Sequence, residues 1–213
     1  MKEKFVQYNY NKFNFVKFFD KGKNVSNLNQ ILRYSSKVAI YKKIKNIKKN
    51  KEFIKNYKNF IKLEIQKIFN EEIVFQKLPN IRVLYPNDIE GVVPYHCDKW
   101  YNHTEDEINF WLPLHKVSKS ESMQFVDLRS SRMLEKKILK NKLNYAQINS
   151  LISRFAKPVK CELGSILKFS PLHLHGNIVN KTRYPRLSID FRVKKLDSKF
   201  QTKTLGGYFD IIK

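Results

Sequence analysis

The apolar positions in the first third of the chain follow a helical period. Between residues 27 and 70 they recur mostly at steps of three and four, with lysines between them. This spacing gathers apolar side chains on one side of a helix and leaves the other side to solvent. We therefore expect two helices with lysine-rich outer faces. The apolar positions are Leu28, Ile31, Leu32, Val38, Ile40, Ile44, Ile47, Phe53, Ile54, Phe60, Ile61, Ile65 and Phe69.

After Pro79 the pattern changes to short strand-like segments bounded by turn residues. The expected strands are 81–85, 92–96, 107–114, 123–128, 165–169, 173–177 and 187–193, and residues 131–155 read as a helical insertion. Short strands without regular strand and helix alternation are typical of an antiparallel sandwich or barrel. The pattern predicts an α+β fold: a double-stranded β-helix (jelly-roll) core with N-terminal helices and a helical insertion.

Length and composition fit one structural domain. The chain has 213 residues, 42% of them hydrophobic, which is enough for one sizeable core. Residues 1–78 are expected to form a helical part that packs on a core of residues 79–213. No apolar run approaches the roughly 18 residues of a membrane-spanning helix, and the first residues lack a signal-peptide pattern, so we expect a cytoplasmic protein. Two cysteines, Cys97 and Cys161, are too few for a disulfide framework.

The formal charge of +23 raises the question of a nucleic-acid partner. Only eight of the 42 basic residues are arginines, whereas base and phosphate recognition favours the guanidinium group. Lysines on amphipathic helices are more often a solvated face. Charge alone therefore favours solvated helices, and a nucleic-acid partner remains possible but not preferred.

A candidate metal site lies in the strand-rich part. His96 and Asp98 stand two residues apart, so in an extended segment both side chains point to one face. His173 and His175 offer a third ligand further along the chain. Two imidazoles and one carboxylate leave open positions on the ion, as non-haem Fe(II) oxygenases require. His175 is the preferred ligand, and His173 is the alternative or a substrate-contacting group.

Arg186 and Ser188 give this triad a chemical context. Arg186 follows His175 by 11 residues, and Ser188 is two residues further on the same strand face. A co-substrate that chelates iron through a keto acid and carries a second carboxylate needs a guanidinium group and a hydroxyl for that carboxylate. These two residues predict a binding site for 2-oxoglutarate.

Other residues are weaker candidates for the same pocket. Strand alternation suggests that Tyr85 and Asn109 contact 2-oxoglutarate. Candidate substrate contacts are Trp100, His103, His173 and Arg192, with Tyr101 in the same loop after the metal triplet. For each of them a purely structural role is the competing interpretation, which for Arg192 is an ion pair with Asp190. Trp111 is expected in the core.

The chain resembles the Fe(II)/2-oxoglutarate-dependent oxygenases through H-x-D at 96–98, the distal His175 and R-x-S at 186–188. The stretches PYHCDKWYNHTEDEINFWLPL and FSPLHLHGNIVNKTRYPRLSIDFR are similar to oxygenases of streptomycin-biosynthesis and bacterial polysaccharide clusters. The resemblance covers roughly residues 80–195. It supports His175 over His173, because H-G-N follows His175 as in the family.

The resemblance implies Fe(II) as cofactor and 2-oxoglutarate and O2 as co-substrates, which are converted to succinate and CO2 as a C–H bond is oxidised. Related halogenases lack the carboxylate that Asp98 supplies, so hydroxylation or another ordinary oxidation is favoured over halogenation. The resemblance implies a sugar, nucleotide sugar or aminocyclitol as the substrate. The alternative is an oxidative demethylase of alkylated nucleic acid, whose signature is similar in the R-x5-R spacing of Arg186 and Arg192. Against it, Val83 stands where that family has an asparagine. A non-enzymatic β-sandwich is disfavoured because all these residues occur together.

Overall fold

The computed structural model describes residues 3–19, 32 and 34–212. Its helices are η1 (Phe15–Phe18), α2 (Lys37–Lys49), α3 (Lys51–Phe60), η2 (Ile61–Ile65), η3 (Gln66–Ile68), η4 (Asp98–Tyr101), α4 (Leu128–Asn141) and α5 (Tyr145–Ser153). Its strands are β1 (Lys4–Gln7), β2 (Ile73–Gln76), β3 (Asn80–Leu84), β4 (Ile108–Pro113), β5 (Gln124–Phe125), β6 (Lys157–Pro158), β7 (Ser165–Phe169), β8 (His175–Gly176), β9 (Arg186–Lys195) and β10 (Phe209–Ile211).

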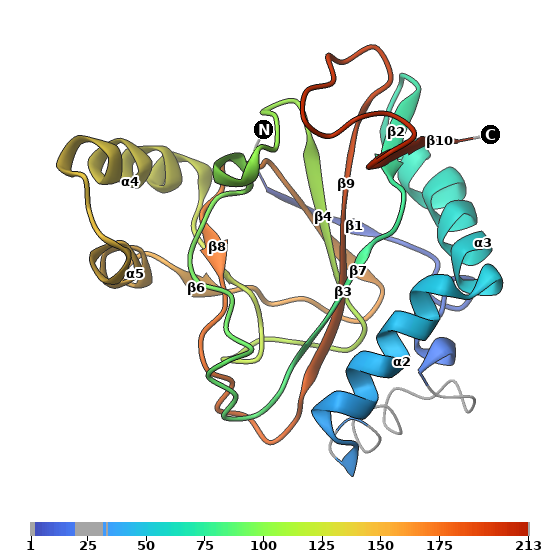
Figure 1. Ribbon diagram of the computed structural model, residues 1–213, viewed down its shortest axis with the longest axis horizontal. Coiled ribbons are helices and arrows are strands. Elements are labelled where there is room, and N and C mark those ends of the chain that lie inside the picture. The colour runs from blue at the N-terminus through green and yellow to red at the C-terminus, as the bar shows by residue number, and fades with distance from the viewer. Residues whose placement is uncertain (1–2, 20–31, 33, 213) are drawn as a thin grey trace.

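Two antiparallel sheets face each other. The major sheet has the order β1-β7-β4-β9-β2-β10, with β3 also pairing with β9, and the minor sheet has the order β6-β5-β8. Helices α2 and α3 lie on the side of the major sheet that faces away from the minor sheet, and α4 and α5 lie beyond the minor sheet (Figure 1). This arrangement agrees with the expected α+β jelly-roll with N-terminal helices and a helical insertion.

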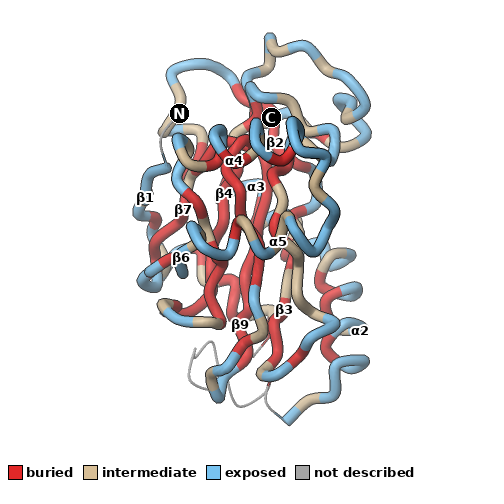
Figure 2. Tube along the Cα trace, turned by 90° about the vertical axis from the view of Figure 1, so that its left-hand side faces the viewer, coloured by how far each residue is buried: buried red, intermediate tan, exposed pale blue. Residues whose placement is uncertain are grey.

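Strand β9 organises the core because its two faces have opposite character. Leu187, Ile189, Phe191 and Val193 belong to the large apolar cluster shared with α2 and α3. Phe191 stacks on Phe110, with ring centroids 5.2 Å apart. The alternate positions from Arg186 to Lys194 are polar yet also buried, and Figure 2 shows β9 buried along most of its length. A buried polar face needs partners between the two sheets.

The N-terminal part differs from the expected pair of helices in two ways. It contributes β1 and β2 to the major sheet, and both strands are only four residues long, too short to give a clear alternating pattern. The helical segment ends as a π turn and a 3-10 turn, η2 and η3. The part of the expected helix at residues 27–31 lies outside the described residues. The boundary at residues 78 and 79 stays a prediction.

The expected strand at 92–96 does not form. Pro94 has no backbone N–H to donate to a ladder, and the segment makes one isolated bridge, between His96 and His175.

None of the helices in the described part of the chain has the length and apolar character that a membrane crossing requires.

Asn50 separates α2 from α3 and gives a test of this helical layer. Its Oδ1 accepts hydrogen bonds from the backbone N–H groups of Glu52 and Phe53, at 2.8 and 3.1 Å. Asn50→Ala removes this cap and is expected to lower the free energy of unfolding by about 1 kcal/mol. Urea denaturation followed by circular dichroism measures it. The exposed Asn46→Ala in the middle of α2 is the matched control, and an equal loss there would contradict the capping role.

Candidate metal centre and adjoining pocket

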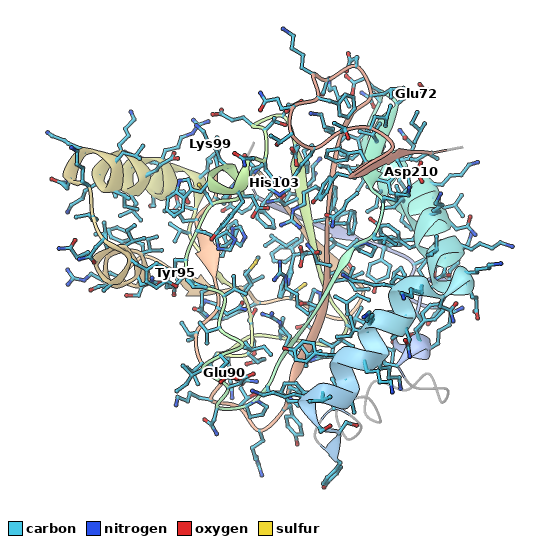
Figure 3. The ribbon with its side chains drawn as sticks, viewed as in Figure 1. Glu72, Glu90, Tyr95, Lys99, His103 and Asp210 are labelled. Atoms are coloured by element: carbon cyan, nitrogen blue, oxygen red, sulfur yellow. The ribbon has the colours of Figure 1, made fainter. Side chains whose placement is uncertain are left out.

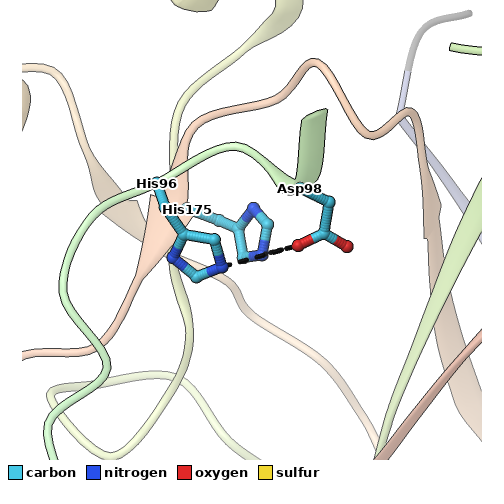
Figure 4. A group of neighbouring side chains, drawn as sticks. All are labelled: His96, Asp98 and His175. Carbon is cyan, nitrogen blue, oxygen red and sulfur yellow. Dashed lines mark ion pairs between the residues drawn. The ribbon is translucent and has the colours of Figure 1, made fainter. Parts of the chain in front are cut away.

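His96, Asp98 and His175 converge in the space between the sheets. His96 precedes η4, Asp98 is the first residue of η4, and His175 begins β8. One ligand atom from each lies within 4.8 Å of the others. The Nε2 atoms of His96 and His175 are 3.5 and 3.7 Å from Oδ1 of Asp98 (Figure 4). This geometry suits three ligands on one face of a single ion.

The backbone and the ring hydrogen bonds orient both imidazoles. His96 and His175 exchange backbone hydrogen bonds of 2.9 and 2.8 Å. The Nδ1 atom of His96 lies 2.8 Å from the carbonyl oxygen of Pro94, and that of His175 lies 3.0 Å from the carbonyl oxygen of His173. With Nδ1–H donated to a carbonyl, each Nε2 lone pair is left for a metal. Burial, and then the neighbouring His96, lower the pKa of His175 to about 3, so its imidazole is neutral at physiological pH.

Arg192 fixes the orientation of Asp98. Its Nε and Nη2 atoms donate to Oδ2 of Asp98 at 3.0 and 2.6 Å, so Oδ1 remains turned toward the histidines. Burial alone would raise the pKa of Asp98, but Arg192 and the two imidazoles outweigh it and hold the pKa well below its usual range. The third arm of the guanidinium donates to Asp190 at 2.5 Å. Arg192, proposed from the sequence as a substrate contact, therefore holds a candidate metal ligand.

A pocket extends from the histidines along the polar face of β9. Besides His96 and His175, the residues that line it are Arg82, Val93, Asn109, Phe110, Trp111, Met123, Phe169, Gly176, Asn177, Arg186, Asp190 and Arg192. In the register of β4 with β9, Asn109 lies opposite Arg192 and Trp111 lies opposite Asp190. Side chains from neighbouring strands thus share one wall.

Arg186 and Ser188 have unused hydrogen-bonding groups in this buried space. Arg186 is 1% exposed, and its guanidinium lies 5.7 Å from the ring centre of Trp111. Its Nη1 donates to Asn177 at 3.1 Å and to the carbonyl oxygen of Glu121 at 3.3 Å, while Nε is unpartnered. The hydroxyl of Ser188, fully buried, also lacks a partner within the described residues. Such groups are rarely left unsatisfied, so the pair fits a bound carboxylate.

The structure separates the two weaker co-substrate candidates. Asn109 faces the pocket, and both atoms of its buried amide lack partners in the described chain. Tyr85 lies elsewhere. It comes directly after β3 and belongs, like the alternate residues Ile81 and Val83, to the apolar cluster on the helix side of the sheet. The structure therefore does not bring Tyr85 to the pocket where a contact with 2-oxoglutarate was expected, because a strand turns alternate side chains to opposite faces.

Two further candidates from the sequence, His173 and Trp100, have partners away from the pocket. His173 is fully buried, stacks on Phe125 with 4.9 Å between ring centroids, and lies 3.3 Å from Glu3. The chain bends at His173, so it does not share a face with His175 as a regular strand would require. Trp100 packs beside α4, and its indole N–H donates to Glu135 at 3.3 Å.

His103 lies in the loop between η4 and β4, near the C-terminal segment (Figure 3), and its Nδ1 is 2.5 Å from Glu107. Tyr101, the last residue of η4, is 61% exposed and sets its ring edge against His96, with 5.2 Å between ring centroids. Tyr101 is thus the aromatic residue after the metal triplet that contacts the ring of a candidate metal ligand. Trp111 is buried, as expected, and also lines the pocket.

Arg82 and Asn177 line the pocket but were not singled out in the sequence. Asp190 lines it too, and its ion pair with Arg192 is the alternative role expected for Arg192 from the sequence. No sequence signal indicated that Asn177 would contact Arg186.

Gly176 provides a test of how closely the two ligand segments must approach. A Cβ on Gly176 would lie 3.0 Å from the carbonyl carbon and oxygen of Pro94, and that carbonyl orients His96. Gly176→Ala should therefore displace the carbonyl and weaken Ni(II) binding by about tenfold, as loss of an orienting partner does. Isothermal titration calorimetry measures it, with thermal unfolding of the metal-free variant as the control for folding. Unchanged Ni(II) affinity would show that this close approach does not position His96.

The fold is similar to the folds of solved non-haem oxygenases, which agrees with the fold expected from the resemblance to Fe(II)/2-oxoglutarate-dependent enzymes. Among individual structures, the non-heme monooxygenase ThoJ in its Ni complex aligns over 98% of this chain and 80% of its own, with a TM-score of 0.56 and 11% identity. The non-heme alpha ketoglutarate dependent carbocyclase SnoK from nogalamycin biosynthesis aligns over 69% of this chain and 62% of its own, with a TM-score of 0.50 and 13% identity.

A sequence match points in the same direction. The streptomycin biosynthesis protein StrG of Streptomyces griseus is 25% identical over 123 residues, which cover 57% of this chain and 47% of StrG. The match thus spans about half of that relative's length. No protein-family model matches the chain. The neighbours in structure are therefore non-haem oxygenases and related enzymes of secondary-metabolite biosynthesis.

Proposed function

We propose that the chain is an Fe(II)/2-oxoglutarate-dependent oxygenase that hydroxylates a small polar substrate, such as a sugar, nucleotide sugar or aminocyclitol. The observation that carries this proposal is the combination of the His96, Asp98 and His175 cluster with the unsatisfied groups of Arg186 and Ser188, which share the buried polar face of β9 with Arg192. A metal site alone would fit many reactions. A buried guanidinium that forms no ion pair with a described carboxylate, beside such a site, favours a dicarboxylate co-substrate.

Each side chain has a defined part in this proposal. His96, Asp98 and His175 hold Fe(II), which when bound supplies the activation of O2 at the expense of 2-oxoglutarate. Arg186 and Ser188 bind the distal carboxylate of 2-oxoglutarate, and Trp111 supports the guanidinium from its ring face. Arg192 keeps Oδ2 of Asp98 occupied, so the carboxylate offers Oδ1 to the metal.

The position of the lysines supports a small substrate over nucleic acid. The lysine-rich helices α2 and α3 cover the side of the major sheet opposite the minor sheet, whereas the pocket lies between the sheets (Figure 1). Most of their lysines are exposed there. A nucleic-acid enzyme would need its basic surface to lead into the metal site.

The match to StrG supports a carbohydrate-related substrate, because StrG is a streptomycin biosynthesis protein. SnoK, which has a similar fold, is a carbocyclase. The fold alone therefore does not fix the reaction, and hydroxylation is proposed on other grounds. Hydroxylation is favoured here because Asp98 keeps a carboxylate at the position that related halogenases leave small.

Succinate formation tests the proposed function. The purified protein is incubated with Fe(II), 2-oxoglutarate and O2, with panels of nucleotide sugars, aminocyclitols and methylated oligonucleotides. We expect iron-dependent succinate formation that a member of the first two panels accelerates. Stimulation by methylated oligonucleotides alone would favour the demethylase, and failure to bind iron would refute every oxygenase assignment.

A further inference from the structure

Three arginines, Arg82, Arg186 and Arg192, line the pocket together with one carboxylate, Asp190. Fe(II) and the 2-oxoglutarate dianion of the proposed function would cancel each other's charge. The three arginines differ in how far their guanidinium groups are already engaged by partners.

The buried arginines are committed to other partners. The guanidinium group of Arg192 donates hydrogen bonds to Asp98 and Asp190. The proposed function assigns Arg186 to 2-oxoglutarate. Both are more than nine-tenths buried, with 7% and 1% exposure. Neither of these two guanidinium groups is therefore free for a further ligand.

Arg82 is the cation that remains available. It lies on β3, opposite Ser188 of β9, and its side chain is 41% exposed although it lines the pocket. Its Nε donates to Asp190 at 2.7 Å, while its two terminal nitrogens make no hydrogen bond to the described residues. Asp190 thus fixes the inner part of the guanidinium and leaves the outer edge for a ligand. That edge presents two N–H donors in a plane, the arrangement that carboxylates and phosphates accept.

We propose that the primary substrate is an anion, and that Arg82 binds its carboxylate or phosphate group while the iron site acts on a carbon elsewhere in the same molecule. Sugar acids and sugar phosphates share this chemistry. The inference rests on the proposed function and narrows its substrate class. Arg82 is thus a specificity-determining residue, distinct from the co-substrate pair Arg186 and Ser188.

Binding to the protein loaded with Ni(II) and 2-oxoglutarate tests this inference, because Ni(II) occupies the site without turnover. Calorimetry compares D-glucuronate, glucose 6-phosphate, inorganic phosphate and the neutral methyl glucoside. We expect at least one acidic sugar to bind about tenfold or more tightly than methyl glucoside, as one charge-assisted pair implies. The two acidic sugars distinguish a carboxylate from a phosphate ligand, and inorganic phosphate tests the anion site without a sugar.

The variants separate charge from structure. Arg82→Gln should abolish the preference for the acidic probe, and Arg82→Lys should restore part of it. Asn80→Ala is the matched control, because Asn80 donates to the same Asp190 at 2.8 Å without carrying charge. Equal binding of neutral and acidic sugars, no binding of any acidic probe, or an unchanged preference in Arg82→Gln would overturn the inference.

The two proposals fail in different ways. If the wild-type protein binds neither Ni(II) nor 2-oxoglutarate, the proposed function fails and this inference falls with it. If the loaded complex forms but shows no anion preference, the oxygenase assignment stands and Arg82 has no such role.

Discussion

Replacing His175 with alanine is expected to abolish iron-dependent succinate formation and to weaken Fe(II) binding by more than about a hundredfold. Loss of a residue that only hydrogen-bonds to a metal ligand weakens metal binding by up to about a hundredfold, and loss of the ligand itself should cost more. His175 supplies one of the three converging ligand atoms, and its Nε2 is oriented by the hydrogen bond from its Nδ1 to the carbonyl oxygen of His173. His96→Ala and Asp98→Ala should behave in the same way.

His173→Ala is the matched control for this experiment. The two histidines are separated by one residue, yet the His173 ring stacks on Phe125 and faces Glu3. Its variant should keep Fe(II) affinity within a few fold, since the carbonyl that orients His175 belongs to the backbone. Anaerobic calorimetry and the succinate assay measure both variants. Loss of metal in His173→Ala but not in His175→Ala would show that the third ligand is misassigned.

Arg186→Leu is expected to raise the KM for 2-oxoglutarate by about two to three orders of magnitude. Truncating one partner of a buried, hydrogen-bonded charge pair costs about 2–5 kcal/mol, and 1.4 kcal/mol corresponds to a factor of ten. Arg186→Lys should recover only part of the affinity, because an ammonium cannot reproduce the planar contact with a carboxylate. Ni(II) affinity should be little changed in both variants, since Arg186 does not contact the three ligands.

Ser188→Ala gives a graded comparison on the same strand face. It removes the unpartnered hydroxyl without removing charge, so the KM for 2-oxoglutarate should rise by about tenfold or less. Calorimetric titration of the Ni(II)-loaded variants with 2-oxoglutarate separates binding from turnover. An Arg186→Leu protein that is folded and binds 2-oxoglutarate like the wild type would refute the co-substrate assignment.

The sequence predicted the parts of this molecule that depend on local pattern. The spacing of His96 and Asp98 and the parity of Arg186 and Ser188 are properties of neighbouring residues. The structure places His96 and Arg186 in the lining of one pocket and Asp98 in contact with the lining residue Arg192. The sequence did not indicate that Tyr85 joins the apolar cluster, because strand alternation alone does not fix which set of alternate positions faces the core.

What could not be predicted depends on contacts between distant segments. The pairing of Arg192 with Asp98 joins residues 94 positions apart, and nothing in either local sequence specifies it. The short strands β1 and β2 are strands because β7 and β9 offer them partners, rather than through their own patterns. Likewise, His96 and His175 come together through a single bridge that replaces the expected strand.

The major sheet keeps the lysine-rich helices and the pocket on opposite faces, and this separation has a practical consequence. The electrostatic character of the helical face can be redesigned, for instance by exchanging Lys45 and Lys55 for glutamate, without altering the walls that contact the substrate. Ion-exchange behaviour, crystallisation and nonspecific adhesion to polyanions can then be adjusted as handling properties of the protein. Substrate selection would be engineered separately, from the residues between the sheets.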